Sequence, residues 1–247
     1  MTPDDLLDVF DAAAAAVRDA VGAISRADIR ARTERPGQYA LDVVADAAAC
    51  AVLERAPVRI VSEESGVHER AGAEITVVID PVDGSTNCSR GIAYWATSIA
   101  AIDADGLLCS LVVNQAAGMR TIAVREGGAF RDGVRLRAST VTRVEDSVIS
   151  IARPPVSPLA WKQYRALACG ALALCEVAAG GIDAHVDTDF AMRPWDYLGA
   201  LLACREAGAT VFDAHDEPLV TTEPGAHRRI VAAGTPELAW ILKQVVA

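Results

Sequence analysis

The segment VVIDPVDGSTN, residues 77–87, constrains the fold of this chain more than any other segment. The apolar, β-branched run over 76–79 is typical of a buried strand, and it ends in the carboxylate of Asp80. Because Pro81 has no backbone N–H with which to continue a sheet ladder, we expect the strand to stop and the chain to turn there. Ligands gather beyond the carboxyl ends of strands in α/β sheets. The segment therefore predicts an α/β fold with a polar site at this strand end.

The predicted turn carries a second carboxylate, Asp83, and is rich in small polar residues. We expect the turn to leave the carbonyl of Val82 unpaired, on the side that Asp80 and Asp83 face. The backbone N–H groups of Gly84-Ser85-Thr86 would open a helix, which is a natural phosphate site. Two carboxylates and a carbonyl are hard oxygen ligands that suit Mg²⁺. The alternative interpretation is an ordinary turn in which Asp83 caps the helix.

Acidic residues also stand at the ends of two other predicted elements. Glu63 and Glu64 follow a short apolar strand over 58–61, and Asp196 opens a helix. Taken separately, the glutamates fit surface charge beside a turn, and Asp196 fits a first-turn acid that interacts with the helix dipole. All these carboxylates nevertheless lie at element ends, where side chains can converge on one cleft. This shared placement is harder to attribute to three separate local causes, and it favours convergence of the carboxylates on one cleft.

The remainder of the chain alternates runs of strands with helices. Hydrophobic spacing and end signals predict helices over 2–24, 41–56, 167–179, 195–207 and 236–246. Apolar runs between turn residues predict strands over 58–61, 75–79, 95–102, 107–113, 120–125, 147–151, 182–186, 210–212 and 229–231. This order favours helices layered on sheets. We expect one domain over 1–247, with a soft internal boundary near 140–146.

Composition narrows the possible partners and compartments. The net charge of −10 argues against a nucleic-acid partner, because such proteins usually carry a basic surface. No apolar run reaches the roughly 20 residues that a membrane-spanning helix needs, and the acidic N-terminus is unlike a signal peptide. The six cysteines show no CxxC pair and no zinc spacing, which favours reduced thiols in a cytoplasm.

Three motifs together resemble a known family. Glu63-Glu64, the run Asp80-Pro81-Val82-Asp83-Gly84-Ser85, and Trp195-Asp196 through Glu206-Ala207-Gly208 are similar to the signature motifs of the inositol monophosphatase family. That family consists of Mg²⁺-dependent, lithium-sensitive phosphatases. The order and spacing of the motifs match, and the resemblance covers nearly the whole chain. It implies a layered αβαβα sandwich of the sugar phosphatase type and a homodimer.

The resemblance also implies roles by position. Glu63, Asp80 and the Val82 carbonyl would hold one Mg²⁺, and Asp80, Asp83 and Asp196 a second, with a weaker third near Glu63. Gly84 and Ser85 would bind the phosphate through backbone N–H groups. The Ser85 hydroxyl and Asp46 would orient and deprotonate the attacking water, so that the implied catalytic residues are Glu63, Asp46 and Ser85.

Several positions depart from the common family pattern. Ser85 replaces a Thr but keeps the hydroxyl, Arg35 stands near an upstream Lys, and Ala40 stands where Asp is frequent. Ala168-Cys169 replaces a Gly-Ser pair, and Asp189 falls where inositol-specific members have a Glu. The candidates for substrate contact are Asp83, Asp189, Cys169 and His185. The four histidines lack metal spacing and are expected at the surface or in loops. For Cys169 the favoured interpretation is a buried helix thiol.

The expected function is a Mg²⁺-dependent phosphomonoesterase for a small polyol or sugar phosphate, with inositol 1-phosphate as the first candidate substrate. Histidinol phosphate, fructose 1,6-bisphosphate and adenosine 3′,5′-bisphosphate are the alternatives. Phosphatases that form an aspartyl phosphate separate their two aspartates by one residue, whereas two residues separate Asp80 from Asp83. We therefore expect direct attack by water. An inactive regulatory or binding protein is a further alternative, but all four predicted acidic ligands are present.

Overall fold

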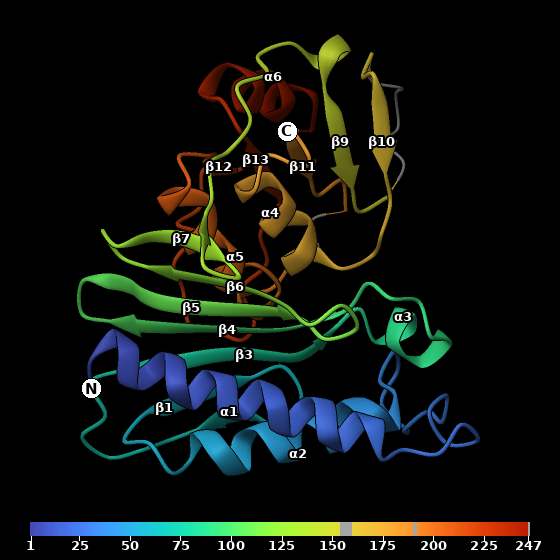
Figure 1. Ribbon diagram of the computed structural model, residues 1–247, viewed down its shortest axis with the longest axis vertical. Coiled ribbons are helices and arrows are strands. Elements are labelled where there is room, and N and C mark those ends of the chain that lie inside the picture. Colours follow the sequence, from blue (N-terminus) through green and yellow to red (C-terminus); the bar gives the residue numbers. More distant parts are fainter. Residues whose placement is uncertain (154–159, 190–191, 247) are drawn as a thin grey trace.

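The computed structural model describes residues 1–153, 160–189 and 192–246, and its helices and sheets stack in five layers (Figure 1). Two helices cover the outer face of a large sheet, two helices lie between this sheet and a smaller one, and a last helix covers the far face of the smaller sheet. The predicted αβαβα sandwich is therefore confirmed. The helices are α1 (Pro3–Gly22), α2 (Ala40–Leu53), α3 (Ser85–Arg90), α4 (Gly170–Ala178), α5 (Pro194–Glu206) and α6 (Pro236–Val246).

The large sheet has eight strands in the order β2-β1-β3-β4-β5-β6-β7-β8. They are β1 (Arg59–Ser62), β2 (Gly66–His68), β3 (Thr76–Asp83), β4 (Ala96–Asp103), β5 (Gly106–Asn114), β6 (Met119–Val124), β7 (Gly128–Arg131) and β8 (Val134–Arg135). Strand β1 pairs with β3 in parallel, and the other neighbours are antiparallel. The predicted strands over 58–61 and 75–79 are thus adjacent and run in the same direction, which brings their carboxyl ends together.

The small sheet has five strands in the order β10-β9-β11-β13-β12. They are β9 (Val148–Ile151), β10 (Gln163–Arg165), β11 (Ala184–Val186), β12 (Thr210–Asp213) and β13 (Ile230–Ala233). The predicted soft boundary near 140–146 falls where the chain passes from the large sheet to the small one, around a 3₁₀ turn at Val144–Asp146. Strand β10 and the short strand β2 are absent from the sequence-based prediction, because neither segment has a clear apolar alternation.

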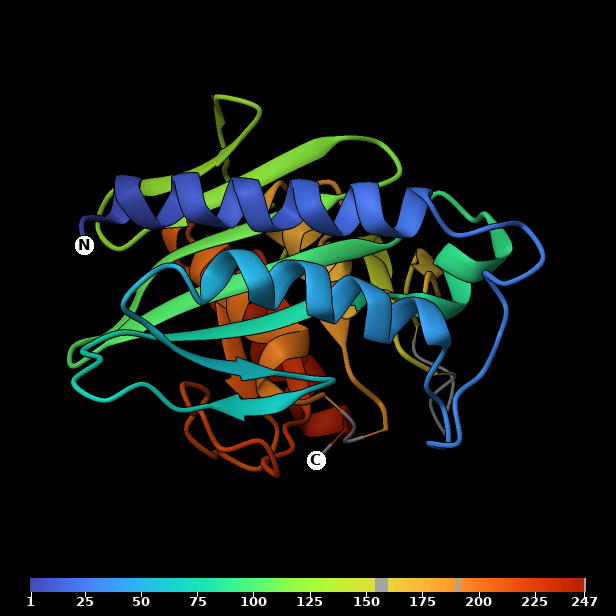
Figure 2. The ribbon, with the colours of Figure 1, turned by 90° about the horizontal axis from the view of Figure 1, so that it is seen from below.

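The helices form where the sequence provides caps and apolar faces. Helix α1 begins with a capping box: the Thr2 hydroxyl accepts a hydrogen bond from the Asp5 N–H at 3.2 Å, and the Asp5 carboxylate accepts one from the Thr2 N–H at 2.8 Å. Its apolar face, which includes Leu6 and Phe10, packs with α2 against the large sheet. Figure 2 shows these two helices lying side by side across that sheet. Helix α2 ends at Leu53, three residues before the predicted end.

Strand β3 differs from its prediction in a way that affects the site. The strand does not stop at Pro81 but continues to Asp83, with a shift in its register against β4 between Asp80 and Asp83. This irregularity accommodates the missing N–H of proline without ending the strand. The Pro81 carbonyl accepts a hydrogen bond from the Thr97 hydroxyl of β4 at 2.8 Å. The prediction of a turn at Pro81 is therefore wrong, and the irregularity changes the direction of the chain within the sheet.

Helix α5 lies very close to the large sheet. A Cβ atom built on Gly199 would lie 2.6 Å from the Ser98 hydroxyl oxygen and 3.2 Å from a methyl group of Val112. The Ser98 hydroxyl itself donates a hydrogen bond to the Trp195 carbonyl at 3.2 Å. This close approach places the first turn of α5, which carries Asp196, beside β3 and β4.

Among the described residues, none of the helices combines the length and the apolar character needed to cross a bilayer. All six cysteines are buried free thiols.

We expect Gly199→Ala to lower the free energy of unfolding by about 1–3 kcal/mol, because the added methyl group must displace Ser98 or move α5 away from β4. Urea denaturation measures this change. Gly22→Ala is the matched control, since no atom lies within 4 Å of the Cβ built there and alanine favours the helix. Equal stability of Gly199→Ala and wild type would contradict the close packing of α5.

Candidate active site

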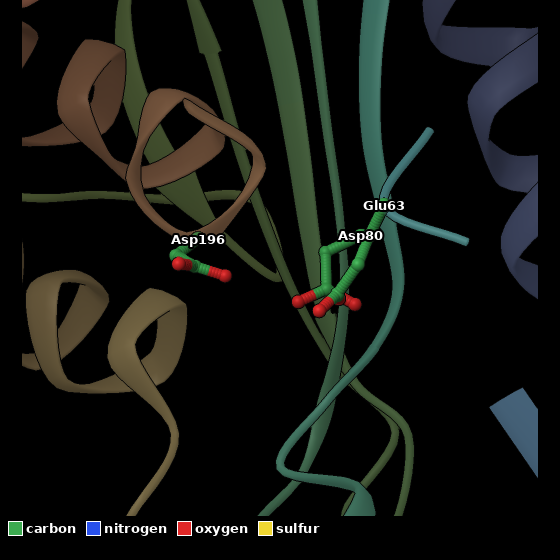
Figure 3. Close-up of side chains that lie close together, drawn as sticks. All are labelled: Glu63, Asp80 and Asp196. Carbon is green, nitrogen blue, oxygen red and sulfur yellow. The ribbon is translucent and has the colours of Figure 1, made fainter. Parts of the chain in front are cut away.

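Parallel pairing of β1 and β3 brings the first two acidic residues together. Ser62 lies opposite Ile79, and the N–H of Glu63 donates to the Ile79 carbonyl at 3.2 Å. Glu63, the first residue after β1, therefore lies directly beside Asp80. Carboxylate oxygens of Glu63, Asp80 and Asp196 lie within 4.8 Å of one another, and Figure 3 shows the three side chains around one point.

Asp196 reaches this point from the opposite side, on the first turn of α5 (Figure 3). Pro194 occupies the start of the helix, where its missing N–H costs no hydrogen bond. One oxygen of Asp196 accepts a hydrogen bond from the Arg193 N–H at 2.6 Å. The Asp196 carboxylate thus caps the N-terminus of α5 and is also part of the three-carboxylate cluster. The structure thus brings together three of the four acids named in the sequence analysis, Glu63, Asp80 and Asp196, and their ligation of a metal stays a prediction.

The three carboxylates are in an unfavourable environment when no cation balances them. Asp80 is buried, and Glu63 and Asp196 are half-buried. Burial, followed by repulsion from Glu64, raises the pKa of Glu63 to about 7. Burial, followed by repulsion from Glu63, raises the pKa of Asp80 and of Asp196 well above the usual range. A divalent cation would remove this penalty, and hard oxygen donors fit Mg²⁺, so the cluster could hold a metal ion.

Asp83 borders the cluster but directs one oxygen elsewhere. That oxygen accepts hydrogen bonds from the Ala171 N–H at 2.7 Å and from the Cys169 thiol at 3.1 Å, at the start of α4. Burial raises the pKa of Asp83, and its charge contributes to the raised pKa of Asp80. Asp83 therefore connects the carboxylate cluster to α4, and its metal ligation stays a prediction.

The turn after β3 also differs from expectation. The Val82 carbonyl is not unpaired, since it accepts a hydrogen bond from the Ser85 hydroxyl at 3.0 Å. A carbonyl oxygen has a second lone pair, so this bond leaves room for one further interaction. Gly84 has a φ of 92°, and a Cβ atom there would lie 3.3 Å from both the Ala168 and Tyr94 carbonyl oxygens. Only glycine fits this position without strain.

Two aspartates that lie one turn apart on α2 have different surroundings in the structure. Asp46, predicted to act with Ser85, instead accepts hydrogen bonds from the Ser62 hydroxyl and, at 3.6 Å, from the Cys50 thiol. Asp42 is buried and accepts a hydrogen bond from the Tyr39 N–H at 2.8 Å. Burial raises the pKa of Asp42, while the hydrogen bond from the Tyr39 N–H and the nearby Ser85 hydroxyl oppose the rise. Asp42 is therefore the aspartate that lies beside Ser85.

Sequence reasoning missed Asp42, although a signal was present. Residues four apart lie on the same face of a helix, so Asp42 and Asp46 both face the sheet. The sequence pattern alone does not say which of these two aspartates lies near the turn after β3, because the answer depends on the position of α2 along the sheet.

The four candidates for substrate contact, Asp83, Cys169, His185 and Asp189, all line one cavity of about 290 Å³. Asp196 lines it as well, so the cavity adjoins the carboxylate cluster. Cys169 is buried at the cap of α4. Asp189 forms an ion pair with Arg153 at 2.9 Å. His185 lies in β11 and is buried, so the expectation that it lies at the surface or in a loop is wrong.

A second cavity, of about 370 Å³, lies on the side of Glu63 and is lined by Arg35, Arg193 and Trp195 among others. Arg35 forms an ion pair with Glu64 at 3.2 Å, and Gln38 also hydrogen-bonds this carboxylate. Glu64 is thus held away from the three-carboxylate cluster.

The five-layer fold and the acidic cluster can be compared with those of known protein families. The model of the inositol monophosphatase family matches residues 8–247, and the chain belongs to this family. Membership supports phosphatase activity.

Individual relatives carry different names. The putative Nus factor SuhB of Neisseria meningitidis serogroup B is 32% identical over 203 residues, which is 76% of each chain. A fructose-1,6-bisphosphatase of Pyrococcus furiosus is 30% identical over 159 residues, 64% of this chain and 62% of the relative. Among solved structures, a hypothetical Pyrococcus horikoshii protein with similarities to inositol-1 monophosphatase has a TM-score of 0.84 at 24% identity. The match covers 99% of this chain and 97% of that one. This last likeness shows the fold.

We expect Mg²⁺ at about 100 times its Kd to raise the free energy of unfolding of the EDTA-treated protein by about 2.7 kcal/mol, because the folded state alone assembles the cluster. Asp80→Asn should abolish this response, and without metal it should be at least as stable as wild type, since one buried charge is removed. Thermal melts with and without Mg²⁺ measure both effects. Asp11→Asn, at a partly exposed aspartate paired with Arg120 far from the cluster in sequence, is the control and should keep the full response. A full response in Asp80→Asn would exclude the cluster as the binding site.

Proposed function

We propose that the chain is a Mg²⁺-dependent phosphomonoesterase that hydrolyses a small polyol or sugar phosphate, with inositol 1-phosphate as the first candidate substrate. The observation that carries this proposal is the group of three carboxylates from β1, β3 and α5 at the edge of a cavity of about 290 Å³. Family membership supports the reaction class. Six buried free thiols agree with a cytoplasmic protein, and the family resemblance suggests a homodimer.

The proposed ligand sets follow the family resemblance. Glu63, Asp80 and the Val82 carbonyl would hold one Mg²⁺, Asp80, Asp83 and Asp196 a second, and Glu63 would contact a weaker third. Bound divalent cations would supply Lewis acidity, which lowers the pKa of water and stabilises charge on the phosphate oxygens. The three carboxylates that lie together agree with this set, and Asp83 would join it with the oxygen that α4 does not engage.

The proton chemistry is assigned to Ser85 and Asp42. The Ser85 hydroxyl donates a hydrogen bond to the Val82 carbonyl and lies near the Asp42 carboxylate. The hydroxyl would turn from Val82 to Asp42, take a proton from the attacking water on its oxygen and pass its own proton to the Asp42 carboxylate. Asp42 thus takes the role that the resemblance implied for Asp46. The N–H groups of Gly84 and Ser85 would hold the phosphate at the start of α3.

The alternative substrates are histidinol phosphate, fructose 1,6-bisphosphate and adenosine 3′,5′-bisphosphate. The relative from P. furiosus is named a fructose-1,6-bisphosphatase, which keeps that substrate among the candidates. Direct attack by water is preferred to an aspartyl phosphate, because Asp80 is buried and already accepts a hydrogen bond from the Val82 N–H at 2.9 Å.

A second candidate role comes from the relatives named Nus factor SuhB, which would make this chain a regulatory binding protein. Such a role does not require several buried carboxylates, whose mutual repulsion destabilises the fold. The intact acidic cluster therefore favours the enzyme.

The activity is tested with a panel of phosphate monoesters in Mg²⁺, with and without Li⁺. We expect hydrolysis of inositol 1-phosphate, inhibition by Li⁺, and loss of at least about 100-fold in kcat for Glu63→Gln, which removes a proposed ligand charge without removing a helix cap. Absence of hydrolysis of every ester by wild type would overturn the enzymatic proposal.

Two matched variants on α2 test the proton assignment. We expect Asp42→Asn to lower kcat about 100-fold or more, because the group beside Ser85 is lost, and Asp46→Asn to lower it less than about 10-fold. Circular dichroism and the Mg²⁺-dependent rise in Tm show whether each variant keeps its fold and its metal site. The reverse order of the two effects would return the role to Asp46.

A further inference from the structure

Positive charge is concentrated at one place on this strongly acidic molecule. The segment between α1 and α2, residues 25–38, carries four arginines and two acids, a net charge of +2. Helix α3 adds Arg90, which makes +3 and leaves −13 for the rest of a chain whose net charge is −10. Figures 1 and 2 both show the segment beside α3. The positive charge therefore lies next to the helix that begins at the proposed phosphate position.

Carboxylates do not neutralise most of these arginines directly. Arg35 is the exception, because it forms the ion pair with the second glutamate after β1. The Arg30 and Arg32 side chains donate to backbone carbonyl oxygens, at 3.3 and 2.9 Å. Within the described part of the chain, Arg26 and Arg90 form no ion pair. Four exposed positive charges are thus open to an anion from solution, and we call them the arginine rim: Arg26, Arg30, Arg32 and Arg90.

Contacts place the arginine rim close to the proposed phosphate position. The guanidinium carbon of Arg32 lies 3.5 Å from the centre of the Tyr39 ring. The Tyr39 hydroxyl in turn lies 3.2 Å from the hydroxyl of Thr86, the residue after Ser85. Arg90 is the last residue of the six-residue helix that Ser85 begins, and such a helix is about 9 Å long. Both arginines therefore lie beside the segment that would hold the phosphate.

The charge of a phosphate ester makes this position significant. A phosphate monoester is mainly a dianion above its second pKa of about 6, so a chain with a net charge of −10 repels it overall. Exposed charges of opposite sign near a site raise the local concentration of an ion and its association rate, by about 10-fold to 10³-fold. Such charges act over about 10 Å at 0.1 M salt, which is comparable to the length of α3. The arginine rim is thus close enough to act on an approaching phosphate.

We propose that the arginine rim attracts the phosphate dianion of the substrate from solution and directs it to Gly84 and Ser85, and thereby sets the rate of substrate capture without taking part in the reaction. This proposal rests on the proposed function and deepens it. The rim acts through charge at a distance, so its effect depends on the sign and number of the charges, and salt removes it. The proposed metal ligands lie on other elements, β1, β3 and α5.

The kinetic test uses charge variants of Arg90 in the full chain, with saturating Mg²⁺ and the phosphate monoester that wild type hydrolyses best. At an ionic strength of about 20 mM, we expect kcat/KM to fall about 2–3-fold in Arg90→Gln and about 5–10-fold in Arg90→Glu. Arg90→Lys keeps the charge and should stay close to wild type. In about 0.5 M KCl the differences should shrink to less than about 1.5-fold, while kcat changes less than about 2-fold throughout. A purely structural role of Arg90 would not follow charge and salt in this way.

Arg55→Gln is the matched control. Arg55 is also exposed and forms no ion pair among the described residues, so the substitution changes the net charge by the same amount. It lies just beyond the far end of α2, a helix of 14 residues and about 21 Å that begins beside Tyr39. This distance is about two Debye lengths at 0.1 M salt, so kcat/KM should change less than about 1.5-fold.

Binding of inorganic phosphate gives a readout that does not depend on turnover. Isothermal titration calorimetry in Mg²⁺ should show that the double variant Arg32→Gln/Arg90→Gln raises the Kd for phosphate about 5–10-fold at low salt. Arg55→Gln should leave this Kd within about 1.5-fold of wild type, and in about 0.5 M KCl all three proteins should bind phosphate equally. Circular dichroism shows whether each variant keeps its fold.

The outcomes separate this proposal from the proposed function. If wild type hydrolyses no ester, the phosphatase proposal fails, and phosphate binding still tests the arginine rim. If wild type is active but Arg90→Glu keeps the wild-type kcat/KM at low salt, the rim proposal alone is overturned. A loss that persists in high salt, or an equal loss in Arg55→Gln, would overturn it as well. Absence of phosphate binding by wild type would count against both proposals.

Discussion

Electrostatic repulsion within a buried group of carboxylates is the constraint on which the rest of this structure depends. Glu63, Asp80 and Asp196 place oxygens within 4.8 Å of one another, and burial and repulsion raise the pKa of each. A folded chain keeps such a group when its scaffold holds the side chains in place and either protonation or a bound cation compensates their charge. The parallel pairing of β1 with β3 fixes two of them, and the capped first turn of α5 fixes the third.

The middle layer of helices connects this group to the cavity. Helix α5 approaches the large sheet so closely that Gly199 has no space for a side chain, while α4 supplies the N–H that holds Asp83. Both helices also pack, through residues such as Leu172 and Leu198, in the core that includes Ile230 of the small sheet. The proposed metal ligands therefore come mainly from the large sheet, whereas the small sheet completes the cavity beside them.

This division explains how one family can contain members with different names. The carboxylate cluster depends on strand pairing and on a helix cap, which loops do not alter. The cavity depends on positions such as His185 and the Arg153–Asp189 pair, whose substitution changes charge and hydrogen bonding without moving β1 or β3. Substrate choice can then change while the reaction class is kept.

Local sequence determined most of the elements and placed the acidic residues at their ends. The apolar strands, the Thr2 cap of α1 and the carboxylates at the ends of β1 and β3 follow from side-chain periodicity and backbone chemistry. Tertiary structure alone decided that β3 continues past Pro81 with a shifted register, that Asp42 rather than Asp46 lies beside Ser85, and that His185 is buried in a cavity. These three outcomes depend on pairing register, on the position of α2 along the sheet and on packing between layers. Each is a relation between segments far apart in the chain, which no local pattern encodes.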